Sequence, residues 1–266
     1  MKQTVIESTD IRVSRFALGT ASLHHLFSFA DRQKLLEAAA SAGITHLDTS
    51  PYYGYGLAEC DLGAFLSGQR AAFTVATKVG LYPRGAAASH VASVWARKAL
   101  GKVLPAVALP VVNWQLARAQ ASLQQSLKRL KTDYVDFLFL HEPDKNLINA
   151  DEFMRWIETE TARGAVRSWG LAGAADKVAP WASACHPLAK VIQTQDSLDK
   201  CQADFMWAAE RRLQFTYGYL SAQRHAVDVN TPGMILLKAL ERNPTGAVVV
   251  STRRLERVAE LAKLAA

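Results

Sequence analysis

The stretch YVDFLFLH, at residues 134–141, is almost continuously apolar. A strand of this composition is typical of a parallel sheet with both faces covered. Other short apolar runs recur along the chain, separated by polar or glycine-containing loops and by segments with helical periodicity. We therefore predict eight parallel strands, at residues 16–19, 45–49, 73–78, 134–141, 168–171, 191–194, 213–217 and 247–251.

Apolar residues at helical spacing lie between these runs. One predicted helix has Ser28 or Asp31 as its candidate N-cap and ends near Gly43. Near the N-terminus, residues 5–7 and 11–13 flank a polar turn and predict a small β-hairpin. Two further helices carry an apolar face, formed by Leu116, Ala119, Leu123, Leu127 and Leu130 in one and by Leu255, Val258, Ala259 and Ala262 in the other.

Eight strand–helix units in 266 residues predict a (β/α)8 TIM barrel that forms one domain over residues 1–266, with the hairpin at its N-terminus. A doubly wound sheet is the alternative, and it requires a glycine-rich turn after the first strand. The nearest match is GYGLAE at residues 54–59, which follows the second strand and ends in Glu59 instead of glycine. A broken match of this kind is weak, so the barrel is favoured.

Half of the residues are hydrophobic and 21% are charged, which indicates a folded chain. No apolar run is long enough to span a membrane, and the N-terminus lacks a signal-peptide core, so we expect a cytoplasmic protein. Cys60, Cys185 and Cys201 are odd in number and far apart, which predicts neither disulfides nor a metal quartet. Adjacent His24 and His25 are expected to point to opposite sides of an extended chain, so no metal site is predicted.

The net charge is +7 and the isoelectric point is about 9.4. This charge suits an anionic partner, and nucleic acid, a phosphorylated cofactor or simply a solvated surface all remain open. The only cluster of basic residues lies at Arg253, Arg254 and Arg257. The sequence lacks a stripe of alternating basic and aromatic residues, which argues against nucleic acid.

Active sites of barrels lie at the carboxyl ends of the strands. Asp48, Tyr53, Lys78 and His141 stand at or just after three predicted strand ends. Lys78 needs a counter-charge, which Asp48 can supply, and a lysine beside the phenol is expected to lower the tyrosine pKa. A neutral His141 could donate a hydrogen bond to a carbonyl oxygen, so together the four could polarise a C=O group and protonate it. They lack a hydride donor, which implies a nicotinamide cofactor. Taken singly, each of the four residues could instead have a structural role.

Three ordered motifs resemble the aldo-keto reductase superfamily: DTSPYYG at residues 48–54, ATKVG at 76–80, and SLKRLKTDYVD at 126–136 running on to His141. The resemblance implies NADPH-dependent reduction of an aldehyde or ketone, or the reverse oxidation. Tyr53 would be the general acid, Lys78 and Asp48 its tuning pair, and His141 the residue that orients the carbonyl. The tyrosine-rich turn resembles the aldose dehydrogenase-like branch, so a small carbonyl compound or polyol is the expected partner. A monomer or weak homo-oligomer without metal, nucleic acid or membrane is expected.

The same resemblance implies a set of cofactor contacts. The segment STRRLER, at residues 251–257, is similar to the loop that grips the adenosine 2′-phosphate. Arginines at the start of a helix are repelled by the positive end of its dipole, and a bound anion would make the interaction favourable. The alternative is that these arginines form a solvated face of the helix without a ligand. The implied cofactor-binding residues are Gly19, Thr20, Asp48, Gln193, Tyr217, Ser251, Thr252, Arg253 and Arg257.

The chain also departs from the family pattern. Ala172 and Gly173 stand where a serine and an asparagine usually bind the nicotinamide carboxamide, and Leu261 replaces an asparagine near adenine. The segment 220–231 is short for a loop that folds over the cofactor, and no long tail follows Arg257. An open site is expected, with cofactor affinity lower by about 10–100-fold. A catalytically weak or inactive protein of this fold, which binds a cofactor or a partner, therefore remains an alternative.

Overall fold

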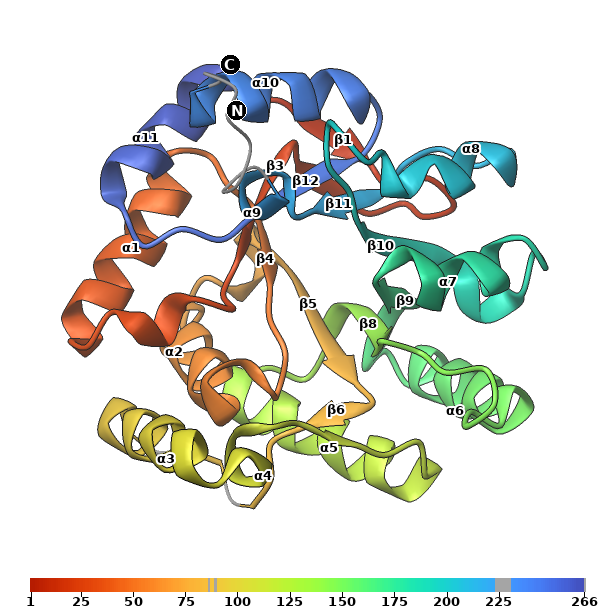
Figure 1. Cartoon of the computed structure of the whole chain (residues 1–266), viewed down its shortest axis with the longest axis horizontal. Helices are drawn as coiled ribbons and strands as arrows, with labels where there is room; N and C mark the ends of the chain where they lie inside the picture. Colours follow the sequence, from red (N-terminus) through yellow and green to blue (C-terminus); the bar gives the residue numbers. More distant parts are fainter. Residues whose placement is uncertain (86, 89, 223–230, 266) are drawn as a thin grey trace.

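The computed structural model describes residues 1–85, 87–88, 90–222 and 231–265. Eight parallel strands close into a barrel, with β12 hydrogen-bonded to β3 (Figure 1). The closed barrel confirms the predicted (β/α)8 architecture and excludes the doubly wound sheet. In barrel order the strands are β3 (Phe16–Gly19), β4 (His46–Asp48), β5 (Thr74–Val79), β8 (Val135–His141), β9 (Val166–Gly173), β10 (Val191–Gln195), β11 (Phe215–Tyr217) and β12 (Ala247–Val250).

Helices surround the barrel and cover its outer face (Figure 1). The first begins after Ser28, one of its two predicted N-caps, and Gly43 follows its end with a positive φ of 81°. The helices are α1 (Phe29–Ser41), α2 (Leu57–Phe65), α5 (Leu116–Leu130), α6 (Ala150–Ala162), α7 (Ala175–Ala182), α8 (Phe205–Ala208), α9 (Tyr219–Ala222), α10 (Pro232–Arg242) and α11 (Leu255–Leu264). None of the helices in the described residues is long and apolar enough to cross a bilayer.

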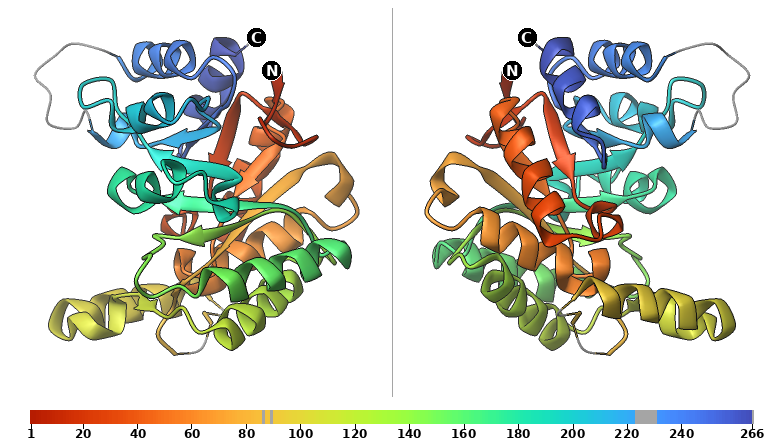
Figure 2. Two further views of the ribbon diagram at one scale, coloured as in Figure 1. Left: turned by 90° about the vertical axis from the view of Figure 1, so that its right-hand side faces the viewer. Right: turned by 90° about the vertical axis from the view of Figure 1, so that its left-hand side faces the viewer.

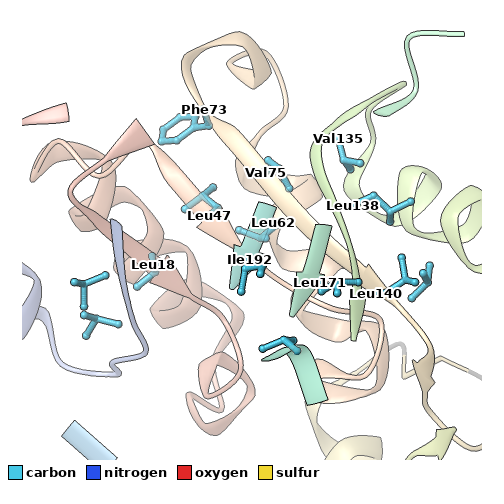
Figure 3. Close-up of a cluster of buried hydrophobic side chains, with 14 of the residues drawn as sticks. Leu18, Leu47, Leu62, Phe73, Val75, Val135, Leu138, Leu140, Leu171 and Ile192 are labelled. Carbon is cyan, nitrogen blue, oxygen red and sulfur yellow. The ribbon is translucent and has the colours of Figure 1, made fainter. Parts of the chain in front are cut away.

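The outward-facing side chains of the strands form the larger part of the core. Figure 3 shows leucines and valines of the strands, such as Leu47 and Leu138, together with Leu62 of α2. Leu62 and Leu138 are both fully buried. On the predicted face of α5, Ala119, Leu123, Leu127 and Leu130 are buried, whereas Leu116 is only partly buried. Burial of this kind contributes roughly 1.5–3 kcal/mol for each large aliphatic side chain. The predicted face of α11 is wrong at Leu255 and Ala259, which are exposed, because that helix buries Val258 and Leu261 instead.

The N-terminal hairpin is formed by β1 (Gln3–Val5) and β2 (Arg12–Ser14), which pair antiparallel. The hairpin is confirmed, although its first strand begins two residues earlier than predicted. Ile6, Ile11 and Val13 from the hairpin are buried against inward-facing barrel residues, including Phe137 and Phe215. The hairpin thus fills the amino-terminal end of the barrel, opposite the end where the candidate catalytic residues lie.

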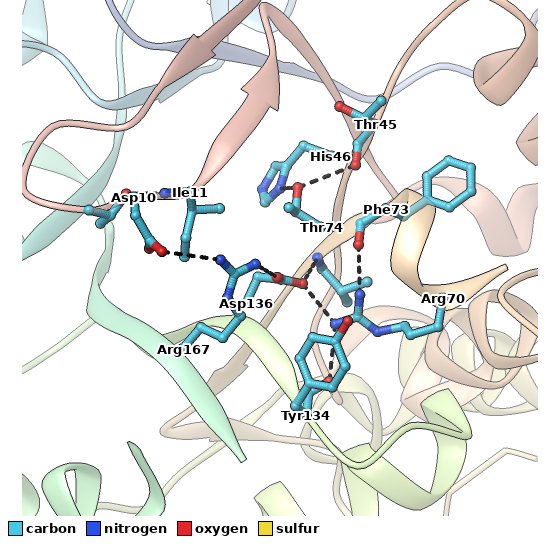
Figure 4. A network of polar contacts seen from close by, with 12 residues as sticks. Asp10, Ile11, Thr45, His46, Arg70, Phe73, Thr74, Tyr134, Asp136 and Arg167 are labelled. Atoms are coloured by element: carbon cyan, nitrogen blue, oxygen red, sulfur yellow. Dashed lines mark hydrogen bonds and ion pairs between the residues drawn. The ribbon is translucent and has the colours of Figure 1, made fainter. Parts of the chain in front are cut away.

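The buried carboxylate of Asp136 links several strands at the amino-terminal end of the barrel. Asp136 accepts hydrogen bonds from Arg70 and Arg167, each at 2.7 Å, and from the backbone N–H of Val75 at 2.8 Å (Figure 4). Arg167 also lies 3.7 Å from Asp10 of the hairpin turn. These contacts tie β5, β8, β9 and the hairpin together, which gives the aspartate of the motif at residues 126–136 a structural role.

An arm of the chain leaves the barrel between β5 and β8 and lies at the edge of the molecule (Figure 2). It contains the paired strands β6 (Leu81–Tyr82) and β7 (Val111–Val112) and the helices α3 (Val91–Val103) and α4 (Pro105–Ala108). Lys98 of α3 contacts the Nε2 atoms of both His24 and His25. The expectation that these histidines diverge is wrong, because they lie in a short 3-10 helix, η1 (Leu23–His25), with ring centroids 4.2 Å apart.

Candidate active site

The four predicted catalytic residues come from neighbouring strand ends. Asp48 is the last residue of β4, Lys78 lies near the end of β5, and His141 is the last residue of β8. These strands are adjacent and parallel, so their carboxyl ends meet at one rim. Tyr53 begins a short 3-10 helix, η2 (Tyr53–Gly56), that follows β4. The structure brings all four side chains to the wall of one pocket.

Lys78 and Asp48 form a buried ion pair. The Lys78 Nζ atom lies 2.7 Å from Oδ1 and 2.8 Å from Oδ2 of Asp48, and it donates to the carbonyl oxygen of Thr49 at 2.9 Å. Burial lowers the pKa of Lys78, and the charge and hydrogen bonds of Asp48 oppose that shift. The predicted counter-charge is therefore confirmed. Removal of either partner would leave an unpaired charge in the barrel.

The turn that carries Tyr53 has an unusual backbone. Gly54, Tyr55 and Gly56 have φ values of 57°, 55° and 93°, in the left-handed region that favours glycine. The turn is also held from outside, because the Tyr52 hydroxyl donates to the carbonyl oxygen of Ala108 in the arm at 3.1 Å. This geometry explains the glycines of GYGLAE without a phosphate-binding role. It presents the Tyr53 ring toward the barrel pocket.

The Tyr53 ring lies between the lysine and the histidine. Its centroid is 4.9 Å from Lys78 Nζ and 6.2 Å from the His141 ring, which is nearly perpendicular to it. Burial lowers the pKa of His141 to about 3, with a smaller effect of the Lys78 charge in the same direction. His141 is therefore neutral at physiological pH and can donate only one ring N–H.

The pKa of Tyr53 differs from the sequence-based expectation. Burial raises the Tyr53 pKa well above its ordinary value, and the carboxylates of Asp48 and Glu142 raise it further. The expectation that Lys78 lowers this pKa is wrong for the protein without ligand, because the ammonium group lies against Asp48 and the phenol is desolvated. Tyr53 therefore holds its proton across the neutral range, which suits a proton donor.

The pocket at this rim has a volume of about 270 Å³. Several residues predicted to contact a cofactor line it, namely Asp48, Gln193, Tyr217 and Ser251. Gln193 donates from Nε2 to Asp48 Oδ1 at 3.0 Å, while its Oε1 atom is buried without a hydrogen-bond partner in the described chain. An unpartnered buried acceptor costs about 1–3 kcal/mol, and the amide N–H2 group of a nicotinamide would satisfy it. The unpartnered acceptor of Gln193 and the neighbouring ring of Tyr217 thus fit a nicotinamide group.

Gly19 and Thr20, which were predicted to contact the cofactor, do not line this pocket. A Cβ atom on Gly19 would approach Ser251 Oγ to 2.6 Å, so a larger residue there would require the Ser251 hydroxyl to move. The Thr20 hydroxyl is buried and donates to the carbonyl oxygen of Asp48 at 3.0 Å. Thr20 therefore supports Asp48, and its side chain is not free for a ligand.

The C-terminal arginines lie outside the pocket lining. Thr252 Oγ1 accepts a hydrogen bond from the backbone N–H of Arg254 at 3.1 Å, just before α11 begins. Arg253 is exposed, and Arg257 forms an ion pair with Glu260 one turn further along. Arg257 is thus held by a carboxylate that an anion would have to compete with. The predicted short loop at 220–231 falls largely on residues outside the described part of the chain.

Sequence reasoning missed three acidic residues near the site. Glu59 is fully buried and accepts hydrogen bonds from Thr77 at 2.6 Å and Arg129 at 2.7 Å, so it ties α2 to β5 and α5. Asp196, directly after β10, accepts from the hydroxyl of the pocket residue Tyr219 at 2.7 Å and pairs with Arg242. The position of Asp196 directly after a strand was a signal in the sequence, whereas Glu59 lies within α2 and had none.

Glu142 is the third missed residue, and it directly follows His141. Its side chain lies against Gly173, which is the last residue of β9 and lines the pocket. In the described ranges, no group of three or more His, Cys, Asp or Glu side chains is arranged to hold a metal ion. The chemistry of the pocket is that of a proton donor, a neutral imidazole and a buried ion pair.

The family model named Aldo/keto reductase family matches residues 15–203. The D-threo-aldose 1-dehydrogenase of a Pseudomonas species is 31% identical over 181 residues, which cover 60% of this chain and 50% of that protein. The chain thus spans about half the length of the curated relatives it matches.

Solved structures share the fold. An aldo-keto reductase from Bacillus halodurans, in its holo form, matches with a TM-score of 0.77 at 19% identity, over 99% of this chain and 90% of that one. An aldo-keto reductase from Klebsiella pneumoniae in complex with NADPH matches with a TM-score of 0.69 at 19% identity, over 99% and 89% of the two chains. The matched residues 15–203 contain the strand ends that carry Asp48, Tyr53, Lys78 and His141, and the chain belongs to the aldo/keto reductase family.

Proposed function

We propose that this protein is an oxidoreductase that transfers a hydride between NADPH and the carbonyl carbon of an aldehyde or ketone. The observation that carries the proposal is the convergence of Asp48, Tyr53, Lys78 and His141 on one pocket at the carboxyl end of the barrel. This set supplies a proton donor, a neutral hydrogen-bond donor and a buried ion pair, with a neighbouring unpartnered acceptor at Gln193. Acid–base chemistry at a carbonyl oxygen needs groups of this kind.

A bound reduced nicotinamide supplies the hydride, with its electron pair, to the carbonyl carbon. His141 donates an N–H to the carbonyl oxygen and orients it, because its low pKa keeps the imidazole neutral. Tyr53 then gives its hydroxyl proton to the same oxygen, so the carbonyl becomes an alcohol, and Tyr53 regains a proton from solvent. Lys78, fixed by Asp48, stabilises the phenolate that this transfer leaves behind. In the oxidation direction, Tyr53 accepts the alcohol proton.

Three features support NADPH as the cofactor. Gln193 and Tyr217 line the pocket where the nicotinamide would lie. Arg253 and Arg257 stand at the start of α11, where they and its free N–H groups suit a 2′-phosphate. One solved structure of this fold, the Klebsiella pneumoniae protein, is in complex with NADPH.

A small polar carbonyl compound or polyol is the proposed substrate class. The support is the tyrosine-rich turn beside the pocket and the similarity to a relative named D-threo-aldose 1-dehydrogenase. The half-buried Tyr53 and His141 form the polar side of the pocket, while Val248 and Leu236 contribute an apolar side. We propose a cytoplasmic enzyme that acts on free small molecules and not on nucleic acid.

The test is a titration of the purified protein with NADPH and with NADH, followed by tryptophan fluorescence, and then a screen of aldehydes and sugars with Tyr53→Phe as control. Saturable binding that favours NADPH, with reduction lost in Tyr53→Phe, is expected. Binding without turnover on any carbonyl would favour the alternative of a cofactor-binding protein of this fold, which the small residues Ala172 and Gly173 motivate. No binding at millimolar cofactor would contradict both.

A further inference from the structure

Glu142 has an unusual place beside the candidate active site. It follows His141 at the end of β8 and has a φ of 53°, in the left-handed region that few non-glycine residues adopt. Its backbone N–H donates to the carbonyl oxygen of Ala172 in β9 at 2.7 Å. Its side-chain Oε2 accepts from the backbone N–H of Ala174 at 3.2 Å. The residue therefore bends over the end of β9.

The carboxylate occupies the space beside a pocket residue. A Cβ atom on Gly173 would lie 2.9 Å from Glu142 Oε2 and 3.2 Å from its Cδ atom. Gly173 therefore accommodates the carboxylate, since any larger residue would displace it. Because Gly173 and Ala172 line the pocket, the acidic group is held just behind a wall made of two small residues.

The carboxylate carries a charge that acts on groups in the pocket. Its Oε1 atom accepts no hydrogen bond from the described residues, and burial raises the pKa of Glu142. Its charge reaches the pocket, because it contributes to raising the pKa of both Tyr53 and Tyr217. For Tyr217, Glu142 is the leading contribution after burial. A positive group in the pocket would be stabilised by this negative charge, in addition to the Ala174 N–H and the charge of Lys177.

We propose that Glu142 is a specificity-determining residue of the nicotinamide site, whose carboxylate, held behind Ala172 and Gly173, favours the positively charged oxidised ring over the neutral reduced ring. The proposal rests on the proposed function, since it requires that the pocket binds a nicotinamide. Oxidised and reduced cofactors differ in the ring charge, so a fixed carboxylate near the ring acts on one form more than on the other.

The experiment measures dissociation constants for NADP⁺ and NADPH with the full-length protein, its Glu142→Gln variant and the control Asp176→Asn. Glutamine keeps the shape and the acceptor for Ala174 and removes only the charge. Asp176 is exposed in the first turn of α7, so its variant removes the same charge close by without a place at the pocket. We expect Glu142→Gln to weaken NADP⁺ about tenfold and NADPH about twofold or less, with both constants within about twofold in Asp176→Asn.

The outcomes separate the two proposals. If the unmodified protein binds neither cofactor form, the proposed function fails and this inference fails with it. If the protein binds both forms and Glu142→Gln leaves their affinity ratio unchanged, the proposed function stands and the role of Glu142 is overturned. A change in substrate KM with an unchanged cofactor ratio likewise overturns it.

A second measurement applies if Glu142→Gln does not fold, as judged by its unfolding transition. The affinity ratio of the two forms is then measured against pH with the unmodified protein. Protonation of Glu142 removes its charge, so the preference for NADP⁺ should decline as the pH falls. The charged groups that act on Glu142 are Asp176 and Lys177 of α7, and Glu142 in turn acts on Tyr53 and Tyr217 across the pocket. A ratio that stays constant down to the lowest pH at which the protein remains folded overturns the proposal.

Discussion

The ammonium nitrogen of Lys78 lies 2.7 Å and 2.8 Å from the two carboxylate oxygens of Asp48, so the lysine faces its counter-ion more closely than it faces the phenol of Tyr53. The same carboxylate accepts an N–H from Gln193. The pair is thus a fixed element of the pocket wall in which Asp48 largely compensates the positive charge of Lys78. It leaves Tyr53 protonated before a ligand binds and ready to act as an acid.

Tyr53→Phe removes the proposed proton donor and keeps the aromatic ring. We expect carbonyl reduction to fall by at least about 10²-fold, because positioned acid catalysis contributes about that much. Cofactor affinity should change by less than about twofold, as measured by fluorescence titration. Full activity in this variant would remove Tyr53 from the proposed mechanism.

Lys78→Met should lose activity and also stability. The substitution leaves the carboxylate of Asp48 buried and unpaired, and breaking a buried pair in this way costs about 3–5 kcal/mol. Urea unfolding monitored by circular dichroism measures the loss. The double variant Lys78→Met/Asp48→Asn removes the unpaired charge, so it should recover part of the stability and none of the activity. Equal stability of the single variant and the parent would contradict a compensated buried pair.

The pH dependence should differ between the two directions of the reaction. Because the pKa of Tyr53 is raised, the phenol is protonated at neutral pH, and reduction should be nearly constant between about pH 6 and 9. Oxidation requires the deprotonated form, so its rate should rise toward about tenfold per pH unit over the same range. His141, with a pKa of about 3, should add no acidic limb above pH 5. If the rate of carbonyl reduction instead declines with rising pH, with a midpoint near pH 7, the Tyr53 pKa is lowered.

Arg257→Ala tests the phosphate site. If Arg257 binds the 2′-phosphate, the variant should weaken NADPH by about tenfold or more, equal to about 1.4 kcal/mol, and NADH by less than about twofold. Arg254→Ala is the matched control, since it removes the same charge from the start of the same helix. Equal losses for the two cofactors would show that Arg257 responds only to general charge and to its ion pair with Glu260.

Much of the architecture could be predicted from the sequence. The apolar run at residues 134–141 became β8 from Val135 to His141, and the other seven predicted strands lie where expected to within a few residues. Parallel strands buried on both faces have few compatible patterns, so local composition was sufficient. The pairing of Lys78 with Asp48 also followed, because a lysine at the end of a buried strand requires a counter-charge.

Other features depend on distances between residues far apart in the chain. The raised pKa of Tyr53 results from burial and from two carboxylates, one of them 89 positions away at residue 142. The contact between Lys98 and the two histidines requires the arm to fold back over the first loop of the barrel.

Gly173 shows most clearly what the sequence alone could not predict. From the sequence, Gly173 only indicates that a usual side chain is absent at a strand end. In the structure, the absence of a side chain leaves room for the carboxylate of Glu142. Residue type and periodicity determined the strands, the rim and the candidate catalytic set. Only the tertiary structure decided which charges face one another across that rim and hence the proton affinity of each group, because electrostatic energies depend on separation and burial.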